Sequence, residues 1–164
     1  MGDEMNRDEF SRRIRENQDK LYRITCGLLR EPQDRLDAVQ DAILKAWCNI
    51  GRLRNEEFFD TWLIRILINE CHNRHRSQAR FVPLETAPEP SEPFRENSQL
   101  RDAVHTLPEK LRIPILLHYM EGYRTDEIAQ MLRLPGGTVR SRLRRARMML
   151  KTLLEDAEGG SEDE

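Results

Sequence analysis

The chain has 164 residues, of which 34 % are charged and 38 % hydrophobic, and its formal net charge is -2. This composition is that of a globular chain with thin helical cores, and it argues against a disordered or fibrous protein. The length allows one medium domain or two small ones. No stretch approaches the ~20 consecutive apolar residues that a membrane span needs.

Cysteine and histidine spacing gives no sign of a disulfide framework or a metal site. Cys26, Cys48 and Cys71 lie far apart without a CxxC pair, which predicts reduced thiols. His72 and His75 follow Cys71, but no second cluster completes a tetrahedral ligand set, so we predict no metal and no cofactor. The segment MGDEMNRDEF has no apolar run of signal-peptide length. We therefore expect a cytoplasmic protein.

The first half of the chain has the apolar spacing of amphipathic helices. A helix is predicted from Arg7 to Arg30, with a buried stripe formed by Phe10, Ile14, Leu21, Ile24 and Leu28. Pro32 is expected to end it, and Asp34 to cap a second helix. The buried stripe of that second helix is Val39, Ile43, Ala46 and Ile50. A third apolar helix begins near Phe59 and ends in basic residues.

A change of composition then separates the two halves. Between Ser77 and Ser98 the apolar content falls, and the segment contains Pro83, Pro88, Pro90 and Pro93. Prolines at this density favour extended conformations, which predicts a semi-stiff linker over residues 78–98. Packing of this linker over one of the halves remains an open alternative.

Helical signals resume near Gln99. Pro108 suits the first turn of the next helix, and Pro114 inside that helix predicts a kink or a later start. Gly122 is expected to end it. Because no strand-type alternation occurs anywhere, the predicted fold class is all-α, with two small helical domains joined by the Pro-rich linker.

The predicted domains follow from these breaks. They cover residues 1–77 and 99–154, with the linker 78–98 between them and an acidic tail over residues 155–164. The tail holds six acids and no base. Terminal blocks of like charge are usually solvated, so the tail is expected to be disordered.

The segment after Gly122 has the form of a helix-turn-helix. Thr125 is expected to cap a short helix whose inner face is Ile128, Ala129, Met131 and Leu132. The residues RLPG break it, and a longer helix begins between Pro135 and Thr138. The core stripe of this longer helix is Val139, Leu143, Ala146 and Leu150. A short helix, a tight turn and a longer basic helix are typical of DNA-binding modules.

Charge on the longer helix supports DNA contact. Residues 124–151 contain eight Arg or Lys against Asp126 and Glu127, and no acid occurs from Gly136 to Lys151. Solvated helix faces usually mix signs, whereas guanidinium groups contact phosphates and guanine edges. The predicted DNA contacts are Thr138, Arg140, Ser141, Arg144, Arg145 and Arg147.

Two blocks of the chain carry a family resemblance. DRLDAVQDAILKAWCNIGRLRNEEFFDTWLIRILINECHNRHR, residues 34–76, resembles region 2 of bacterial RNA polymerase sigma factors. LPEKLRIPILLHYMEGYRTDEIAQMLRLPGGTVRSRLRRAR, residues 107–147, resembles region 4. The order of the blocks and the short linker make the chain similar to an extracytoplasmic-function (ECF) sigma factor. The match departs from the family pattern at Arg133, where glycine is usual, and at Gly136.

The resemblance implies a role for specific residues. The helix containing DAVQD matches the surface that docks on the clamp coiled coil of the polymerase's largest subunit, formed here by Leu36, Asp37, Gln40, Asp41 and Trp47. The segment RNEEFFDTWLIRILIN matches the part that opens and holds the -10 promoter element, through Asn55, Phe59, Trp62, Arg65 and Asn69. Without the resemblance, we would assign Phe59 and Trp62 to the core, because large aromatic side chains dominate small cores. The helix-turn-helix would read the -35 element as duplex DNA.

The resemblance also implies partners: polymerase core, promoter DNA and an anti-sigma factor that covers both halves until a signal releases them. No paired-carboxylate, Ser/His/Asp or phosphate-loop pattern is present, which predicts a specificity subunit and not an enzyme. One rival interpretation is a helix-turn-helix regulator that binds duplex DNA without polymerase core, but residues 7–76 resemble no ligand or dimerisation domain. A second rival is an adaptor that sequesters a partner, which leaves the arginine-rich helix unexplained.

Overall fold

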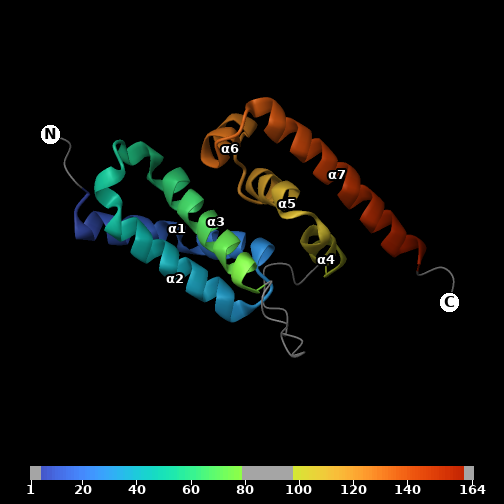
Figure 1. Ribbon diagram of the computed structural model, residues 1–164, viewed down its shortest axis with the longest axis horizontal. Helices are drawn as coiled ribbons and strands as arrows, with labels where there is room; N and C mark the ends of the chain where they lie inside the picture. Colours follow the sequence, from blue (N-terminus) through green and yellow to red (C-terminus); the bar gives the residue numbers. More distant parts are fainter. Residues whose placement is uncertain (1–4, 79–97, 161–164) are drawn as a thin grey trace. The chain divides into compact units, whose positions relative to one another are not determined.

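The computed structural model describes residues 5–78 and 98–160. Contacts divide the chain into two units, Met1–Pro88 and Glu89–Glu164 (Figure 1). Every regular element in the described ranges is helical, which confirms the all-α fold class. The predicted linker 78–98 lies almost wholly outside the described residues.

The first unit consists of three helices that pack against one another: α1 (Arg7–Leu28), α2 (Pro32–Cys48) and α3 (Phe59–Gln78). Two short 3-10 turns, η1 (Ile50–Arg52) and η2 (Glu56–Phe58), lead from α2 into α3. All five residues of the predicted α1 stripe are buried, as the helical spacing requires. Fully buried side chains from α1 and α3 form the centre of the core: Leu21, Ile24, Leu28, Phe59, Leu63, Ile64 and Leu67.

Helix α2 begins three residues earlier than predicted. Pro32 is its first residue, where a missing N–H costs nothing, and Glu31 is the N-cap residue without a side-chain bond. Asp34 therefore lies in the first turn, where its carboxylate favours the helix dipole, and the prediction that it caps the helix was wrong. The buried face is Ala38, Val39, Ala42 and Ala46, whereas Ile43 and Ile50 are only half-buried.

Three polar ties join the helices of this unit. Buried Arg35 donates to the carbonyl oxygens of Leu29 and Arg30, at 2.8 and 2.9 Å, and so ties α2 to the residues that follow α1. The Asn17 amide donates to the Asp60 carboxylate at 2.9 Å. Lys45 on α2 pairs with Glu70 on α3. Because buried polar groups are costly when unpaired, these ties also specify how the helices align.

The second unit contains α4 (Ser98–Thr106), α5 (Glu109–Ile115), the π-helical segment η3 (Leu116–Met120), α6 (Thr125–Leu132) and α7 (Gly136–Gly159). Helix α7 packs against α4, α5 and α6, so it joins the other helices of the unit into one core. Val139, Leu143 and Ala146 of its predicted stripe are buried, and Leu150 is half-buried. Facing them are buried side chains of the other helices: Val104, Leu107, Leu111, Ile115, Leu117, Ile128 and Met131.

The disturbance expected at Pro114 takes the form of a π-helical segment. Helix α5 begins at Glu109, with Pro108 as its N-cap residue, and contains Pro114. The chain then widens its hydrogen-bond spacing: the amide of Glu121 donates to the Leu116 carbonyl at 3.3 Å, five residues back. Gly122 follows with φ of 73°, a left-handed conformation that glycine adopts without strain, which confirms it as the stop.

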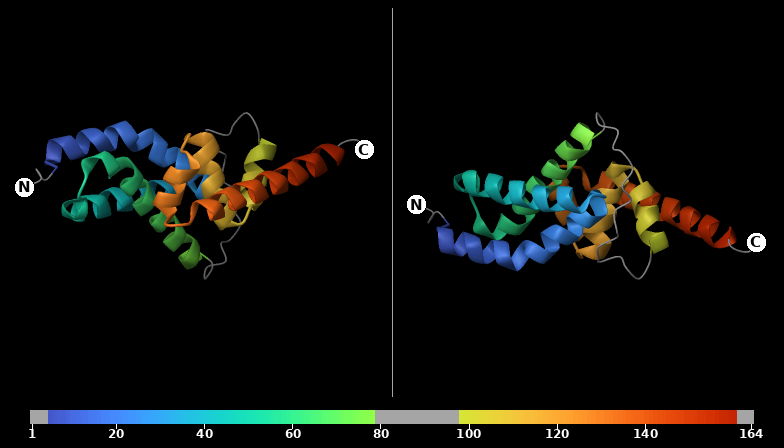
Figure 2. Two further views of the ribbon diagram at one scale, coloured as in Figure 1. Left: turned by 90° about the horizontal axis from the view of Figure 1, so that it is seen from above. Right: turned by 90° about the horizontal axis from the view of Figure 1, so that it is seen from below.

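The first part of the predicted acidic tail is helical and not disordered, while residues 161–164 lie outside the described residues. Helix α7 continues to Gly159, so residues 155–159 are helical although exposed (Figure 2). Extending an existing helix needs no new nucleation, and Lys151 lies 3.9 Å from Glu155 one turn on. The last turns of α7 project beyond the other helices of its unit in both views of Figure 2. Among the helices of the described ranges, none is both long and apolar enough to cross a membrane.

Candidate nucleic-acid and protein interfaces

Helix α2 exposes an apolar stripe on the side away from its core. Leu36 is 50 % exposed, Leu44 62 % and Trp47 41 %, and the exposed Gln40 lies between them. Spacings of four, four and three residues place these side chains on one helix face. Sequence reasoning missed Leu44, although its spacing of four from Gln40 and eight from Leu36 was a usable signal. An exposed apolar stripe of this kind is a candidate protein-binding surface.

Two carboxylates flank this stripe, and both already have partners within the chain. Asp37 accepts a hydrogen bond from the Gln33 amide at 3.0 Å. Asp41 accepts one from Arg74 of α3 at 2.5 Å. The Trp47 side chain packs against an aromatic ring instead, since its ring centre lies 5.0 Å from that of Phe10. These contacts restrain the side chains of Asp37, Asp41 and Trp47 within the chain itself.

Three of the predicted -10 contacts share one side of α3. Trp62 and Arg65 are half-buried and Asn69 is exposed, and spacings of three and four residues align them along the helix. Asn55 lies in the preceding loop, where its side-chain oxygen accepts a hydrogen bond from the Glu57 amide at 3.0 Å and caps η2. The structure therefore aligns Trp62, Arg65 and Asn69 along α3 and places Asn55 in the loop before it.

Phe59 was wrongly assigned to this surface. It has no exposed area, its ring meets that of Phe10 edge to face at 5.8 Å, and the Arg13 guanidinium lies 5.5 Å from the ring centre. A ring enclosed in this way cannot stack on a base. Its neighbour Phe58 is 53 % exposed and is the aromatic residue that this loop presents to solvent.

In the second unit, α6 and α7 form the predicted helix-turn-helix. Thr125 is the first residue of α6 and Arg124 is the N-cap residue, so the expected Thr125 cap was wrong. The Arg124 amide instead donates to the Glu127 carboxylate at 2.8 Å. That carboxylate reaches back from the first turn as Glu does in a capping box.

The turn between the two helices has a specific hydrogen-bond pattern. The Leu134 amide donates to the Ala129 carbonyl at 3.0 Å, and the Arg133 amide to the Gln130 carbonyl at 3.4 Å. This is a Schellman motif, which needs a left-handed residue just after the helix. Arg133 occupies that position with φ of 54° and ψ of 47°, and it is the only non-glycine residue with positive φ in the described ranges. The conformation costs a residue with a Cβ about 1 kcal/mol relative to glycine.

The outward face of α7 is basic, as predicted. Arg140, Ser141, Arg144 and Arg145 are exposed, and Thr138 is half-buried. The Arg140 guanidinium lies over the first turn of the helix, since a Cβ atom on Gly136 would come within 3.3 Å of its Nη1. Glycine at position 136 therefore leaves room for this side chain. Within the described residues, no ion pair involves Arg140, Arg144 or Arg145, so the amino-terminal turns of α7 present a positively charged surface.

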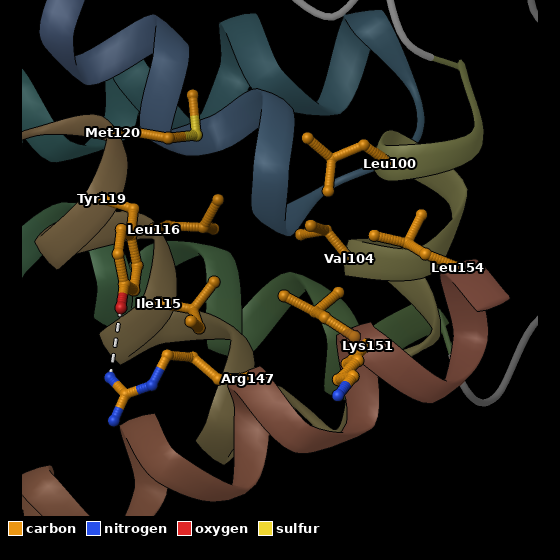
Figure 3. A pocket seen from close by; sticks show the side chains of 10 residues that line it. Leu100, Val104, Ile115, Leu116, Tyr119, Met120, Arg147, Lys151 and Leu154 are labelled. Atoms are coloured by element: carbon orange, nitrogen blue, oxygen red, sulfur yellow. Dashed lines mark hydrogen bonds between the residues drawn. The ribbon is translucent and has the colours of Figure 1, made fainter.

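Arg147 lies one turn beyond Arg144 on α7 and makes a contact within the second unit. Its guanidinium donates to the Tyr119 hydroxyl at 3.1 Å (Figure 3). Both residues border an apolar groove of about 460 Å³ between α4, η3 and α7. Lys151 lies on the same border, and the apolar lining comprises Leu100, Val104, Ile115, Leu116, Met120, Leu150 and Leu154. Within the described parts of the chain, no three His, Cys, Asp or Glu side chains gather closely enough to hold a metal ion.

Comparison with known proteins matches both units. A model of the Sigma-70 region 2 family matches residues 13–81, and a model of Sigma-70, region 4, matches residues 97–150. The ECF RNA polymerase sigma-E factor of Haemophilus influenzae is 34 % identical over 139 residues, which cover 73 % of this chain and 74 % of the relative. The ECF RNA polymerase sigma factor SigM of Mycobacterium tuberculosis is 34 % identical over 157 residues, which cover 91 % of this chain and 79 % of that relative.

Solved structures agree with this fold. The sigma factor RpoE of Bartonella quintana, in complex with the anti-sigma factor NepR, matches with a TM-score of 0.78 and 24 % identity over 90 % of this chain and 97 % of that one. CnrH in complex with the cytosolic domain of CnrY matches with a TM-score of 0.72 and 24 % identity, covering 92 % and 90 %. With both regions matched in order and relatives aligned over most of their length, the chain belongs to the ECF family of RNA polymerase sigma factors.

Proposed function

We propose that the two units of this alternative sigma factor divide promoter recognition between them. The first unit binds RNA polymerase core and the melted -10 element, and the second reads the -35 element as duplex DNA. The observation that carries the proposal is the acid-free arginine face of α7 within a helix-turn-helix, in one chain with the exposed stripe of α2. We assign residues 1–77 to region 2, 78–98 to the linker, 99–154 to region 4 and 155–164 to an acidic extension.

The α2 surface is suited to a protein partner with apolar and basic side chains. Leu36, Leu44 and Trp47 supply apolar area, and Gln40 supplies hydrogen bonds between them. Asp37 and Asp41 add negative charge at the edge, which favours a basic complement and fixes the orientation of binding. We assign this surface to the clamp coiled coil of the polymerase's largest subunit.

The loop before α3 and the first turns of that helix are suited to single-stranded DNA. Unpaired bases stack on aromatic rings and pair with amides through their edges. Phe58 takes the stacking role that the buried Phe59 cannot fill. Trp62, Arg65 and Asn69 continue this surface along α3, and Asn55 lies at its loop end.

Helix α7 is suited to the major groove of the -35 element. In a helix-turn-helix the amino-terminal residues of the second helix contact base edges. Thr138, Arg140, Ser141, Arg144 and Arg145 lie there, and guanidinium groups pair bidentately with guanine. Arg147 lies further along α7 and bonds to Tyr119, so we do not retain it as a DNA contact.

We place this activity in the cytoplasm, because polymerase core and promoter DNA are there, and we assign the chain no bond-making chemistry of its own. The Bartonella quintana sigma factor RpoE was solved in complex with the anti-sigma factor NepR, which supports such a partner here. An affinity purification from native cells should recover an anti-sigma protein in addition to polymerase subunits. Recovery of polymerase subunits alone would count against that partner.

Transcription from a reconstituted holoenzyme tests the proposal. Core plus the full chain should start transcription from a defined set of genomic fragments, while core alone should not. A variant with Arg144→Gln and Arg145→Gln should keep core binding and lose those start sites. If the chain binds genomic duplex fragments but produces no start sites with core, the regulator interpretation is supported instead.

A further inference from the structure

We propose that Arg133 binds a backbone phosphate of the -35 duplex from the turn of the helix-turn-helix. The inference rests on the proposed function of the second unit. It adds a residue that belongs to neither helix and that the predicted set of contacts did not include.

The backbone conformation at position 133 is unfavourable for an arginine. Both hydrogen bonds of the Schellman motif require the left-handed conformation at position 133. Glycine adopts it freely, and asparagine tolerates it better than a long side chain does. The surrounding Schellman motif holds this conformation, and residues strained in this way cluster at functional sites.

No interaction within the described residues explains the arginine. Its side chain is exposed and takes part in no hydrogen bond, ion pair or ring contact there. The nearest acids before it in sequence, Asp126 and Glu127, lie in the first turn of α6 beside Arg124. No acid follows until Glu155. As far as the described residues go, the guanidinium is thus solvated and available to an anion from outside the chain.

The position of the turn indicates which anion it meets. In a helix-turn-helix the first helix crosses the DNA backbone, while the second enters the major groove by its amino terminus. Arg133 lies on the path between the two, three residues before α7 begins at Gly136. Base edges belong to the residues of α7 itself, with Arg140 over its first turn. A long cationic side chain in the turn therefore meets phosphate oxygens, which carry no sequence information.

The test measures the affinity of reconstituted holoenzyme for duplex DNA over a series of salt concentrations, with variants of the full chain. One duplex carries the -35 element of a promoter that the wild-type holoenzyme transcribes, and the other lacks it. Arg133→Asn keeps a residue that tolerates the left-handed turn and removes the charge. Arg133→Lys keeps the charge. Lys110→Gln is the control, because it removes one exposed positive charge from the same unit outside the helix-turn-helix.

Arg133→Asn should weaken binding to both duplexes by a similar factor, about three- to tenfold. It should also reduce the salt slope, the steepness with which the logarithm of the binding constant falls with the logarithm of the salt concentration, by about one. Arg133→Lys should retain most of the slope and Lys110→Gln should match the wild type. Melting temperatures of the variants equal to or above that of the wild type should show that the turn is intact. An unchanged salt slope in Arg133→Asn, or a loss confined to the duplex with the -35 element, would overturn the inference. Failure of the wild type to form a DNA-binding holoenzyme would instead overturn the proposed function on which the inference rests.

Discussion

The guanidinium of Arg74 on α3 donates to the carboxylate of Asp41 on α2 at 2.5 Å, and it also lies 4.0 Å from Asp34. One side chain thus holds two acids that are spaced two turns apart on α2. Because Asp41 belongs to the proposed polymerase-docking surface, the pair links the packing of the first unit to the shape of that surface.

A double-mutant cycle should reveal this link. With side chains 24 % and 45 % exposed, Arg74 and Asp41 form a partly screened pair. Asp41→Asn and Arg74→Gln should therefore show a coupling free energy of about 0.5 to 1 kcal/mol in urea unfolding. Strict additivity of the two single substitutions would mean that the pair does not contribute to stability.

Leu44 should matter for binding and not for folding. Its side chain is 62 % exposed, so Leu44→Ala should change the free energy of unfolding by less than about 0.5 kcal/mol. The same substitution should weaken binding to polymerase core by about tenfold, as expected for an apolar anchor at an interface. Met148→Ala, at an exposed position of the second unit, serves as the control. Equal core affinity for Leu44→Ala and the wild type would remove this residue from the docking surface.

Substitution of Phe59 should reduce stability, whereas substitution of its neighbour Phe58 should reduce DNA opening. Phe59→Ala should cost about 3 to 5 kcal/mol of stability, because the ring is fully enclosed. Phe58→Ala should leave the unfolding midpoint nearly unchanged and reduce open-complex formation, measured by permanganate reactivity of unpaired thymines. Normal open complexes with Phe58→Ala would exclude the stacking role.

Glu9 should give the first unit a measurable dependence on pH. Hydrogen bonds from Arg12 and Arg13 lower the pKa of Glu9 from 4.5 to about 2. Since the pKa is depressed in the folded state, the stabilisation is complete above about pH 4.5 and is lost as the pH falls toward 2. Glu9→Gln should therefore be less stable than the wild type at pH 7, and urea unfolding should show the difference shrinking through that window. A difference independent of pH would contradict the assignment.

Helical periodicity predicted the cores of both units well, because burial on one face follows directly from the spacing of apolar residues. Periodicity could not show which of Phe58 and Phe59 is buried, because both lie next to the start of α3. The contact between the rings of Phe59 and Phe10 decides it, and that contact is tertiary. Sequence reasoning also put Asp34 at an N-cap that Glu31 occupies, because a proline can begin a helix as well as end one. These errors are shifts of one to three residues.

Side-chain direction along α7 was the other limit of sequence reasoning. The charge pattern treated its arginines as one group, but the Tyr119 contact turns Arg147 toward the groove between α4, η3 and α7. Only the packing of η3 against α7 reveals that contact. The strain at Arg133 was equally hidden, because a departure from glycine in the sequence does not by itself show that the backbone keeps the left-handed turn.

A titration of the full chain against RNA polymerase core tests the central claim most directly. The matched variant combines Asp37→Ala, Gln40→Ala and Leu44→Ala and leaves Asp41 with its Arg74 partner. Tight binding by the wild type and at least about tenfold weaker binding by a folded variant are expected. No binding of the wild type to core, with duplex DNA still bound, would contradict the sigma-factor account.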